Sequence, residues 1–154
     1  MTRIGVDTNI LIYAEGIEFV PADRPKIEAA RRLMHGLLAA QDRPVLALQA
    51  LAELYRLLVT KARLPSEIAH SRIRRLMGVS ETVETTEDIF DHAVALARDH
   101  GFQIFDAIIL AAAAEARCDL LLSEDMQDGF AWRGVTVTNP FGASPDRRIA
   151  DYLK

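Results

Sequence analysis

The sequence predicts an α/β protein in which a mostly parallel sheet is covered by helices on both faces. Short apolar runs of strand length alternate along the chain with longer segments whose apolar residues recur at helical spacing. This alternation is typical of three-layer α/β/α sandwiches. At 154 residues, half of them apolar, the chain has the size of one domain with a single core. We therefore expect one domain over residues 1–154, with a peripheral tail from about residue 142.

The first part of the chain predicts a strand and two helices. Residues 3–6 alternate polar and apolar side chains and end at Asp7, so we expect a strand there and a short helix over 9–14. Residues 16–25 contain two prolines and predict a loop. The next segment, 26–40, has the spacing of an amphipathic helix. Its predicted apolar face consists of Ile27, Ala30, Met34, Leu37 and Leu38.

The middle of the chain predicts a strand, two helices and a further short strand. Residues 45–48 form an apolar run of strand length, and 49–62 return to helical spacing. A proline suited to a first helical turn opens the helix expected over 65–77, and a glycine closes it. Residues 82–84 favour a strand.

The last part predicts two helices and two strands. Thr85 opens a capping-box pattern, so we expect a helix that runs from there to His100. After Asp106 the chain is almost wholly apolar, which only a helix buried against a sheet tolerates. The runs 120–122 and 135–137 predict the remaining strands.

Four carboxylates fall where this fold gathers functional groups, at the carboxyl ends of strands or in the first turns of the following helices. They are Asp7, Glu53, Asp106 and Asp125, with Asp128 close by. Taken singly, Asp7 also suits a helix N-cap, and the last two acids suit a loop. Acids that converge at one edge of a sheet repel one another and must bind a cation or hold protons. An all-oxygen ligand set favours Mg²⁺ or Mn²⁺, which points to hydrolysis of phosphate esters.

The order and spacing of these acids make the chain resemble the PIN-domain family of metal-dependent ribonucleases, especially the VapC-like toxins of bacterial type II toxin–antitoxin pairs. The resemblance covers nearly all of the chain. It is carried by the segments "VDTNILIYA", "ALAELYRLL", "IFDAIILAAAAEARCD" and "LLSEDMQDG". The resemblance implies an endoribonuclease that cleaves single-stranded RNA with Mg²⁺ or Mn²⁺.

The resemblance also implies a role for each acid. Asp7 and Asp106 match direct metal ligands, Glu53 matches a residue that acts through the metal or water, and Asp125 completes the acidic pocket. Asn9 matches a position that orients the first Asp.

Three nearby positions depart from the family pattern. Ser123 stands where the family more often has Thr, and Glu124 and Asp128 add acids that many members lack. These departures leave open whether Asp125 alone or Asp125 with Asp128 approaches a second metal position.

Positive charge is concentrated in one segment of an acidic chain. The net charge is −4, which argues against a protein that coats nucleic acid by bulk electrostatics. Residues 56–75 hold six Lys or Arg and one Glu, a net charge of +5, so the rest of the chain carries −9. This segment is either a solvated helical surface or a rim that faces RNA phosphates. The residues expected to contact RNA are Lys61, Arg63, Arg72, Arg74 and Arg75.

The resemblance and the composition predict partners and location. By resemblance, a small cognate antitoxin covers the pocket. The apolar faces of 26–40 and 49–62 would serve a homodimer, although core packing explains them equally well. We expect a cytoplasmic protein with no membrane span, because the chain starts without a secretory signal and its longest apolar run is far below the roughly 20 residues of a spanning helix. The single Cys118 excludes an internal disulfide and a thiolate zinc cage.

Two other functions fit parts of the pattern. A haloacid-dehalogenase-like phosphatase also has an Asp after its first strand, as a nucleophile, but its second acid two positions later is Asn9 here. A PIN-like module that binds RNA or a protein without cutting would not need all four acids.

Overall fold

The computed structural model describes residues 1–40 and 43–154, in which a six-stranded sheet has the order β3-β2-β1-β4-β6-β5. All neighbouring strands are parallel except β5 and β6, which are antiparallel. The strands are β1 (Ile4–Val6), β2 (Val45–Ala47), β3 (Glu81–Val83), β4 (Leu120–Leu122), β5 (Ala131–Trp132) and β6 (Val135–Thr138). The five strands expected from the sequence are confirmed. Strand β5 was missed because two residues at a sheet edge carry no periodic signal.

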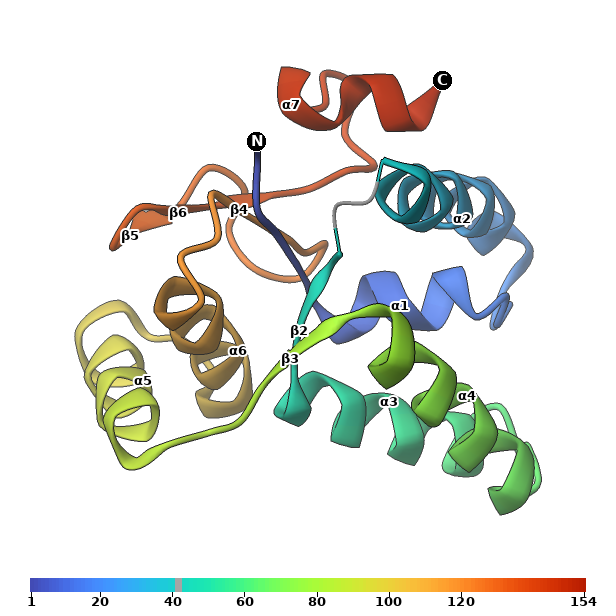
Figure 1. The fold of residues 1–154 in the computed structure, drawn as a ribbon, viewed down its shortest axis with the longest axis horizontal. Coiled ribbons are helices and arrows are strands. Elements are labelled where there is room, and N and C mark those ends of the chain that lie inside the picture. Colours follow the sequence, from blue (N-terminus) through green and yellow to red (C-terminus); the bar gives the residue numbers. More distant parts are fainter. Residues whose placement is uncertain (41–42) are drawn as a thin grey trace.

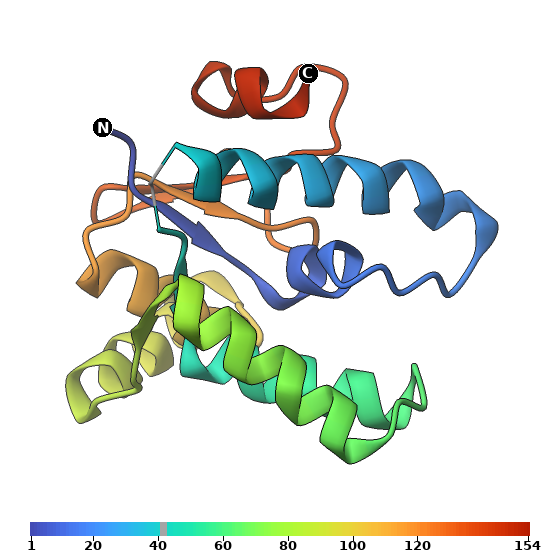
Figure 2. The same ribbon diagram turned by 45° about the vertical axis from the view of Figure 1, so that its right-hand side comes forward.

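Helices cover both faces of this sheet and confirm the predicted sandwich. They are α1 (Thr8–Ala14), α2 (Arg24–Ala39), α3 (Leu48–Thr60), α4 (Ser66–Val79), α5 (Glu87–His100), α6 (Ile104–Glu115) and α7 (Arg147–Ala150), with the 3₁₀ turns η1 (Pro21–Asp23) and η2 (Asp151–Leu153). Helix α2 lies on one side of the sheet with the C-terminal helices outside it, whereas α5 and α6 lie on the other side (Figures 1 and 2). Helices α3 and α4 pack together and α3 packs against α1.

Three local expectations need correction. The N-cap of α5 is Thr86, not Thr85, and its hydroxyl accepts the N–H of Ile89 at 3.2 Å. The loop expected over 16–25 contains the turn η1. Leu38 was placed on the apolar face of α2, but it is 41% exposed because the helix turns that position away from the core.

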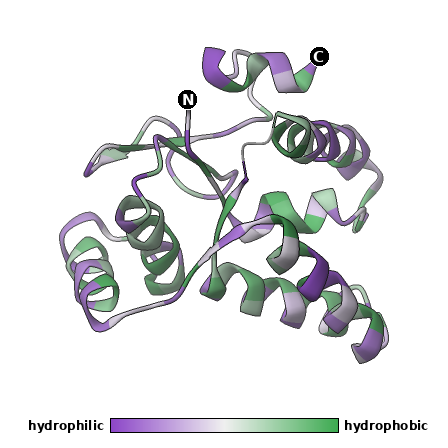
Figure 3. Ribbon diagram, in the orientation of Figure 1, coloured by the Kyte–Doolittle hydropathy of each residue, from purple (hydrophilic) through white to green (hydrophobic). Residues whose placement is uncertain are grey.

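The core explains why the helical faces are apolar. The inner sides of α2 and α3 are buried in one cluster with the central strands and α6. Helix α6 is hydrophobic along most of its length (Figure 3), and it packs on β2, β4 and β6. The apolar faces offered by the sequence for a homodimer are therefore used inside the fold. No helix in the described ranges has the length and apolar character that a membrane crossing requires.

The C-terminal tail packs on the outer side of α2. Ile149 of α7 is fully buried, and Tyr152 lies over Gly36. A Cβ atom at Gly36 would stand 2.6 Å from Cδ1 of Tyr152, so a glycine is needed for this close approach. The tail from residue 142 is thus peripheral to the sheet but attached to the fold.

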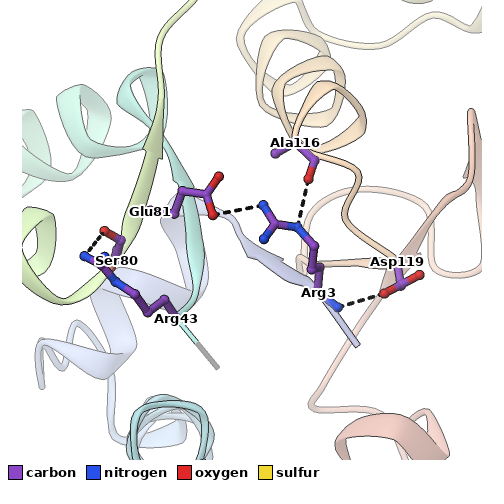
Figure 4. Close-up of polar contacts among 6 residues, drawn as sticks. All are labelled: Arg3, Arg43, Ser80, Glu81, Ala116 and Asp119. Atoms are coloured by element: carbon purple, nitrogen blue, oxygen red, sulfur yellow. Dashed lines mark hydrogen bonds and ion pairs between the residues drawn. The ribbon is translucent and has the colours of Figure 1, made fainter. Parts of the chain in front are cut away.

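Arg3 links the amino ends of the strands through hydrogen bonds and an ion pair. Its backbone N–H donates to Asp119 at 2.7 Å, its Nε donates to the carbonyl of Ala116 at 2.9 Å, and its guanidinium pairs with Glu81 at 2.9 Å (Figure 4). These partners lie at the starts of β4 and β3 and at the end of α6. The carboxyl ends of the strands, and the acids that follow them, lie at the opposite edge.

Candidate active site

Asp7 is the most buried member of the predicted acidic cluster. It follows β1 as the N-cap of α1 and is 2% exposed. Three donors hold its carboxylate: the Ser123 hydroxyl at 2.8 Å, the Asn9 amide at 3.1 Å and the backbone N–H of Thr8 at 2.7 Å. The carboxylate is therefore fixed in one orientation.

Ser123 and Asn9 also join the end of β4 to the first turn of α1. The Ser123 hydroxyl accepts the N–H of Met126 at 3.2 Å, and the Asn9 carbonyl oxygen accepts the N–H of Glu124 at 3.1 Å. The N–H of Asp7 itself donates to the carbonyl of Leu122 at 2.9 Å. The loop after β4 is thereby held against Asp7.

Glu53 reaches the same edge of the sheet from α3. The Thr8 hydroxyl donates to the carbonyl of Ala50 at 3.2 Å and lies 3.5 Å from Oε2 of Glu53. The Gln49 amide donates to Oε1 of Glu53 at 3.2 Å. Glu53 is thus partly buried beside the residue that follows Asp7.

Asp106 and Asp125 are the other two acids of the predicted cluster. Asp106 lies in the first turn of α6, where the Gln103 side chain caps the helix by accepting the N–H groups of Phe105 and Asp106 at 2.9 and 3.0 Å. Asp125 is exposed in the loop after β4. A cavity of about 210 Å³ includes Asp106, Asp125, His100 and Gln103 in its walls.

The charges of these acids act on one another. The pKa of Asp7 is raised to about 7, chiefly by burial and in smaller part by the nearby carboxylates of Asp106 and Glu53, against the lowering effect of its hydrogen bonds. Burial, followed by repulsion from Glu53 and Asp125, raises the pKa of Asp106 to about 6. Within the described ranges, no Lys or Arg forms an ion pair with any of the four. The site therefore holds negative charge that the chain does not neutralise.

This arrangement fits a hard divalent cation. Among residues 1–40 and 43–154, no three His, Cys, Asp or Glu side chains form a ready cage for a metal ion. The acids instead interact in pairs, which link Asp7 to Asp106 and Glu53, and Asp106 to Glu53 and Asp125. Mg²⁺ is usually held by one or two carboxylates and leaves its other positions to water and substrate phosphate. The carboxylates of Asp7 and Asp106 are donors of the kind that Mg²⁺ prefers.

Two neighbouring acids are not part of this group. Asp128 accepts the backbone N–H of Asn139 at 2.9 Å in an exposed turn. Glu124 pairs with Lys26 at 2.6 Å and accepts the hydroxyl of Tyr13 at 3.1 Å. Both carboxylates therefore have structural partners away from Asp7.

The basic residues of segment 56–75 fall into two groups, one paired with an acid and one exposed. Arg72 and Arg75 pair with the buried carboxylate of Glu15 at 3.4 and 2.7 Å, so part of their charge is compensated inside the molecule. Lys61, Arg63 and Arg74 are exposed, and within the described chain no side-chain partner holds them.

Sequence reasoning missed several residues beside the acids. Gln103 and Phe105 stand three positions and one position before Asp106. Arg56, counted from the sequence only in the basic segment 56–75, lies one turn after Glu53 on α3. Their positions in the same helical turns are the signal that would have found them. His100 was interpreted as a surface or packing residue. It contributes to the cavity that contains Asp106, and its ring meets Phe130 edge-on at 5.2 Å.

Comparison with known proteins agrees with this architecture. The PIN domain family model matches residues 4–130. The chain matches none of the curated proteins. Similar solved structures are a toxin–antitoxin complex from Klebsiella pneumoniae (23% identity, TM-score 0.62, covering 90% of this chain and 98% of that one) and a sarcin–ricin-loop-cleaving VapC toxin from Mycobacterium tuberculosis (20%, 0.59, 77% and 86%). A third is a VapBC complex from Rickettsia felis bound to a DNA fragment from its promoter (17%, 0.56, 79% and 87%). At these identities the likeness shows the fold.

Proposed function

Because the chain belongs to the PIN-domain family, we propose that it is a Mg²⁺- or Mn²⁺-dependent endoribonuclease that hydrolyses phosphodiester bonds in RNA. One observation supports this most strongly. A buried Asp7, held by three donors, lies beside Glu53 and Asp106 with no cation from the chain to neutralise them. A fold does not retain such repulsion for stability, so the carboxylates point to an ion that the function requires.

Each carboxylate has a distinct place in the proposed site. Asp7 and Asp106 would hold the ion, with Glu53 on one side and Asp125 on the other. When bound, a divalent ion of this kind supplies a water of lowered pKa and neutralises charge on the leaving oxygen.

Ser123 and Asn9 are positioning residues in this proposal. By donating to the same oxygen of Asp7, at 2.8 and 3.1 Å, they hold its carboxylate in a fixed direction. The Asp7 carboxyl keeps a proton up to about pH 7 and releases it when a cation takes the proton's place. Asp128 joins the turn before β5 to Asn139, which follows β6, and is not needed as a ligand.

We further propose that the protein is the toxin of a toxin–antitoxin pair. The similar structures include a toxin–antitoxin complex, of which 98% of one chain aligns with this protein. A small antitoxin would then be its partner, and its expression would relieve growth arrest caused by the toxin alone. A homodimer stays a prediction, which light scattering of the purified protein measures.

Cleavage of total cellular RNA tests the proposed activity. The purified protein is incubated with RNA in Mg²⁺ or Mn²⁺, with EDTA as one control and Asp106→Asn as another, and the new RNA ends are sequenced. Asp99→Asn is the matched substitution, because Asp99 is an exposed acid on α5 that pairs with Arg98 outside the site.

We expect discrete cuts with the wild type and Asp99→Asn, and none with EDTA or Asp106→Asn. RNA binding without cuts by the wild type would contradict the proposal and favour a non-catalytic module.

A further inference from the structure

We propose that the cavity beside Glu53 is a nucleobase site, which holds one unpaired base, preferentially guanine, next to the bond that is cut. This inference rests on the proposed ribonuclease function and names a specificity site for it. The cavity measures about 540 Å³ and lies between α3 and the start of α6. Its walls are Gln49, Ala52, Glu53, Arg56, Gln103 and Phe105.

Phe105 supplies a stacking face. It is 47% exposed, although α6, in whose first turn it lies, is otherwise mostly buried. Within the described chain, its ring contacts no other aromatic side chain. Glu53 lies in the wall of the same cavity, so a base stacked on this ring would lie beside one acid of the candidate site. Unpaired bases in RNA are commonly bound by stacking on such rings.

The polar groups around the ring are positioned to bind the edge of a base. Gln103 uses its carbonyl oxygen to cap α6, which orients the side chain and leaves its amide N–H groups available. Gln49 donates to Glu53 through its amide and keeps its carbonyl oxygen as an acceptor. The guanidinium of Arg56 has no partner among the described residues. The cavity thus offers donors on Gln103 and Arg56 and acceptors on Gln49 and Glu53.

The charge of the cavity favours a base over a phosphate. Its wall holds one acid, Glu53, and one basic residue, Arg56, so the cavity has no net positive charge to attract a phosphate, whereas a neutral base can bind to both groups. A guanidinium fork matches the adjacent N7 and O6 acceptors of guanine, which is the most frequent specific contact of arginine with a base. Arg56 and the Gln103 amide therefore favour guanine.

Binding of short single-stranded RNA tests this site independently of cleavage. The probes carry guanine, adenine, uracil, cytosine or an abasic residue at one position, and a further probe carries fluorescent 2-aminopurine there. Affinity and 2-aminopurine quenching are measured for Asp106→Asn, which leaves the RNA uncut, alone and combined with substitutions in the cavity. Phe105→Leu keeps apolar bulk and removes the aromatic face. Phe90→Leu is its matched control, because Phe90 is 50% exposed on α5.

We expect Phe105→Leu to weaken binding of the guanine probe about tenfold and to abolish the quenching. Phe90→Leu should change neither, and the abasic probe should bind equally to both variants. Arg56→Lys should remove the preference for guanine while it keeps most of the affinity, since lysine retains the charge without the fork.

Equal affinity of Phe105→Leu and Phe90→Leu for the guanine probe would overturn the proposal, and so would equal binding of the guanine and abasic probes. Cuts by the wild type whose positions do not change in Phe105→Leu would also overturn it, while the ribonuclease function stands. If the protein bound bases selectively but never cut RNA, the proposed nucleobase site would stand and the proposed ribonuclease function would be wrong.

Discussion

Replacement of Asp7 by Asn should stabilise the metal-free protein at neutral pH. The pKa of Asp7 is about 7 in the fold against an ordinary value of 3.8, chiefly because the carboxylate is buried. Below about pH 4 the group is protonated in the folded and unfolded states and costs nothing. As the pH rises from 4 to 7, the unfolded chain releases the proton and the folded chain retains it, so the free energy of unfolding falls. Above pH 7 the loss is complete.

The size of this effect follows from the shift. A difference of about three pKa units corresponds to about 4 kcal/mol of lost stability at pH 7.5, at 1.36 kcal/mol per unit. Asn cannot accept from both Thr8 and the Ser123–Asn9 pair, because one of its two terminal atoms is a donor. The lost hydrogen bond costs about 1 kcal/mol at every pH. Asp7→Asn should thus gain about 3 kcal/mol at pH 7.5 and lose about 1 kcal/mol at pH 4.

Urea unfolding in EDTA at pH 4, 5.5 and 7.5 measures this difference. Asp99→Asn serves as the control, since Arg98 lowers the pKa of Asp99 and its removal should not stabilise the protein at neutral pH. Saturating Mg²⁺ should stabilise the wild type and leave Asp7→Asn unchanged. Stability curves for the wild type and Asp7→Asn that run parallel from pH 4 to 7.5 would refute the reasoning.

Four further outcomes are expected. Calorimetry should show Mg²⁺ affinity falling about tenfold per pH unit between pH 7 and 6 and more steeply below pH 6, because the ion must displace the proton of Asp7 and then also that of Asp106; a flat profile would contradict this. Ser123→Ala should lower the cleavage rate about 10- to 100-fold and Ser123→Thr should restore it, whereas equal rates would remove the positioning role. Lys61→Glu with Arg74→Glu should weaken RNA binding in low salt, measured by anisotropy, and leave Mg²⁺ affinity unchanged; unaltered RNA binding would show a merely solvated surface. Ile149→Ala should lower the free energy of unfolding by about 2–4 kcal/mol, and a smaller loss would mean that the tail is loosely attached.

The fold was largely predictable because its signals are local. The apolar run 120–122 and the helical spacing of apolar residues in 49–62 can be recognised within each segment, because a strand or helix of any such sandwich buries its apolar residues in the same way. The two-residue strand β5 and the tail helix α7 were not predictable, since they depend on contacts with β6 and α2.

The candidate site was predictable only in part. The approach of Asp7 and Glu53 follows from the rule that carboxyl ends of parallel strands meet at one edge. Asp106 lies in the first turn of a helix that comes after α5 and not after a strand, so its place depends on how α6 packs on the sheet. Glu15, at the end of α1, pairs with Arg72 and Arg75 of α4. This is a tertiary contact, which the number of charges along the sequence does not reveal. The cavity beside Phe105 likewise forms only when α3 and α6 come together.

The most direct test of the central claim is the cleavage rate of one mapped RNA fragment in Mg²⁺. It is measured for the wild type, Asp7→Asn, Glu53→Gln, Asp106→Asn and Asp99→Asn. If the acids form one metal site that cuts RNA, the three site variants lose at least about 100-fold in rate and Asp99→Asn keeps the wild-type rate. Cleavage by Asp7→Asn or Asp106→Asn at the wild-type rate, or equal cleavage in EDTA, would contradict the account.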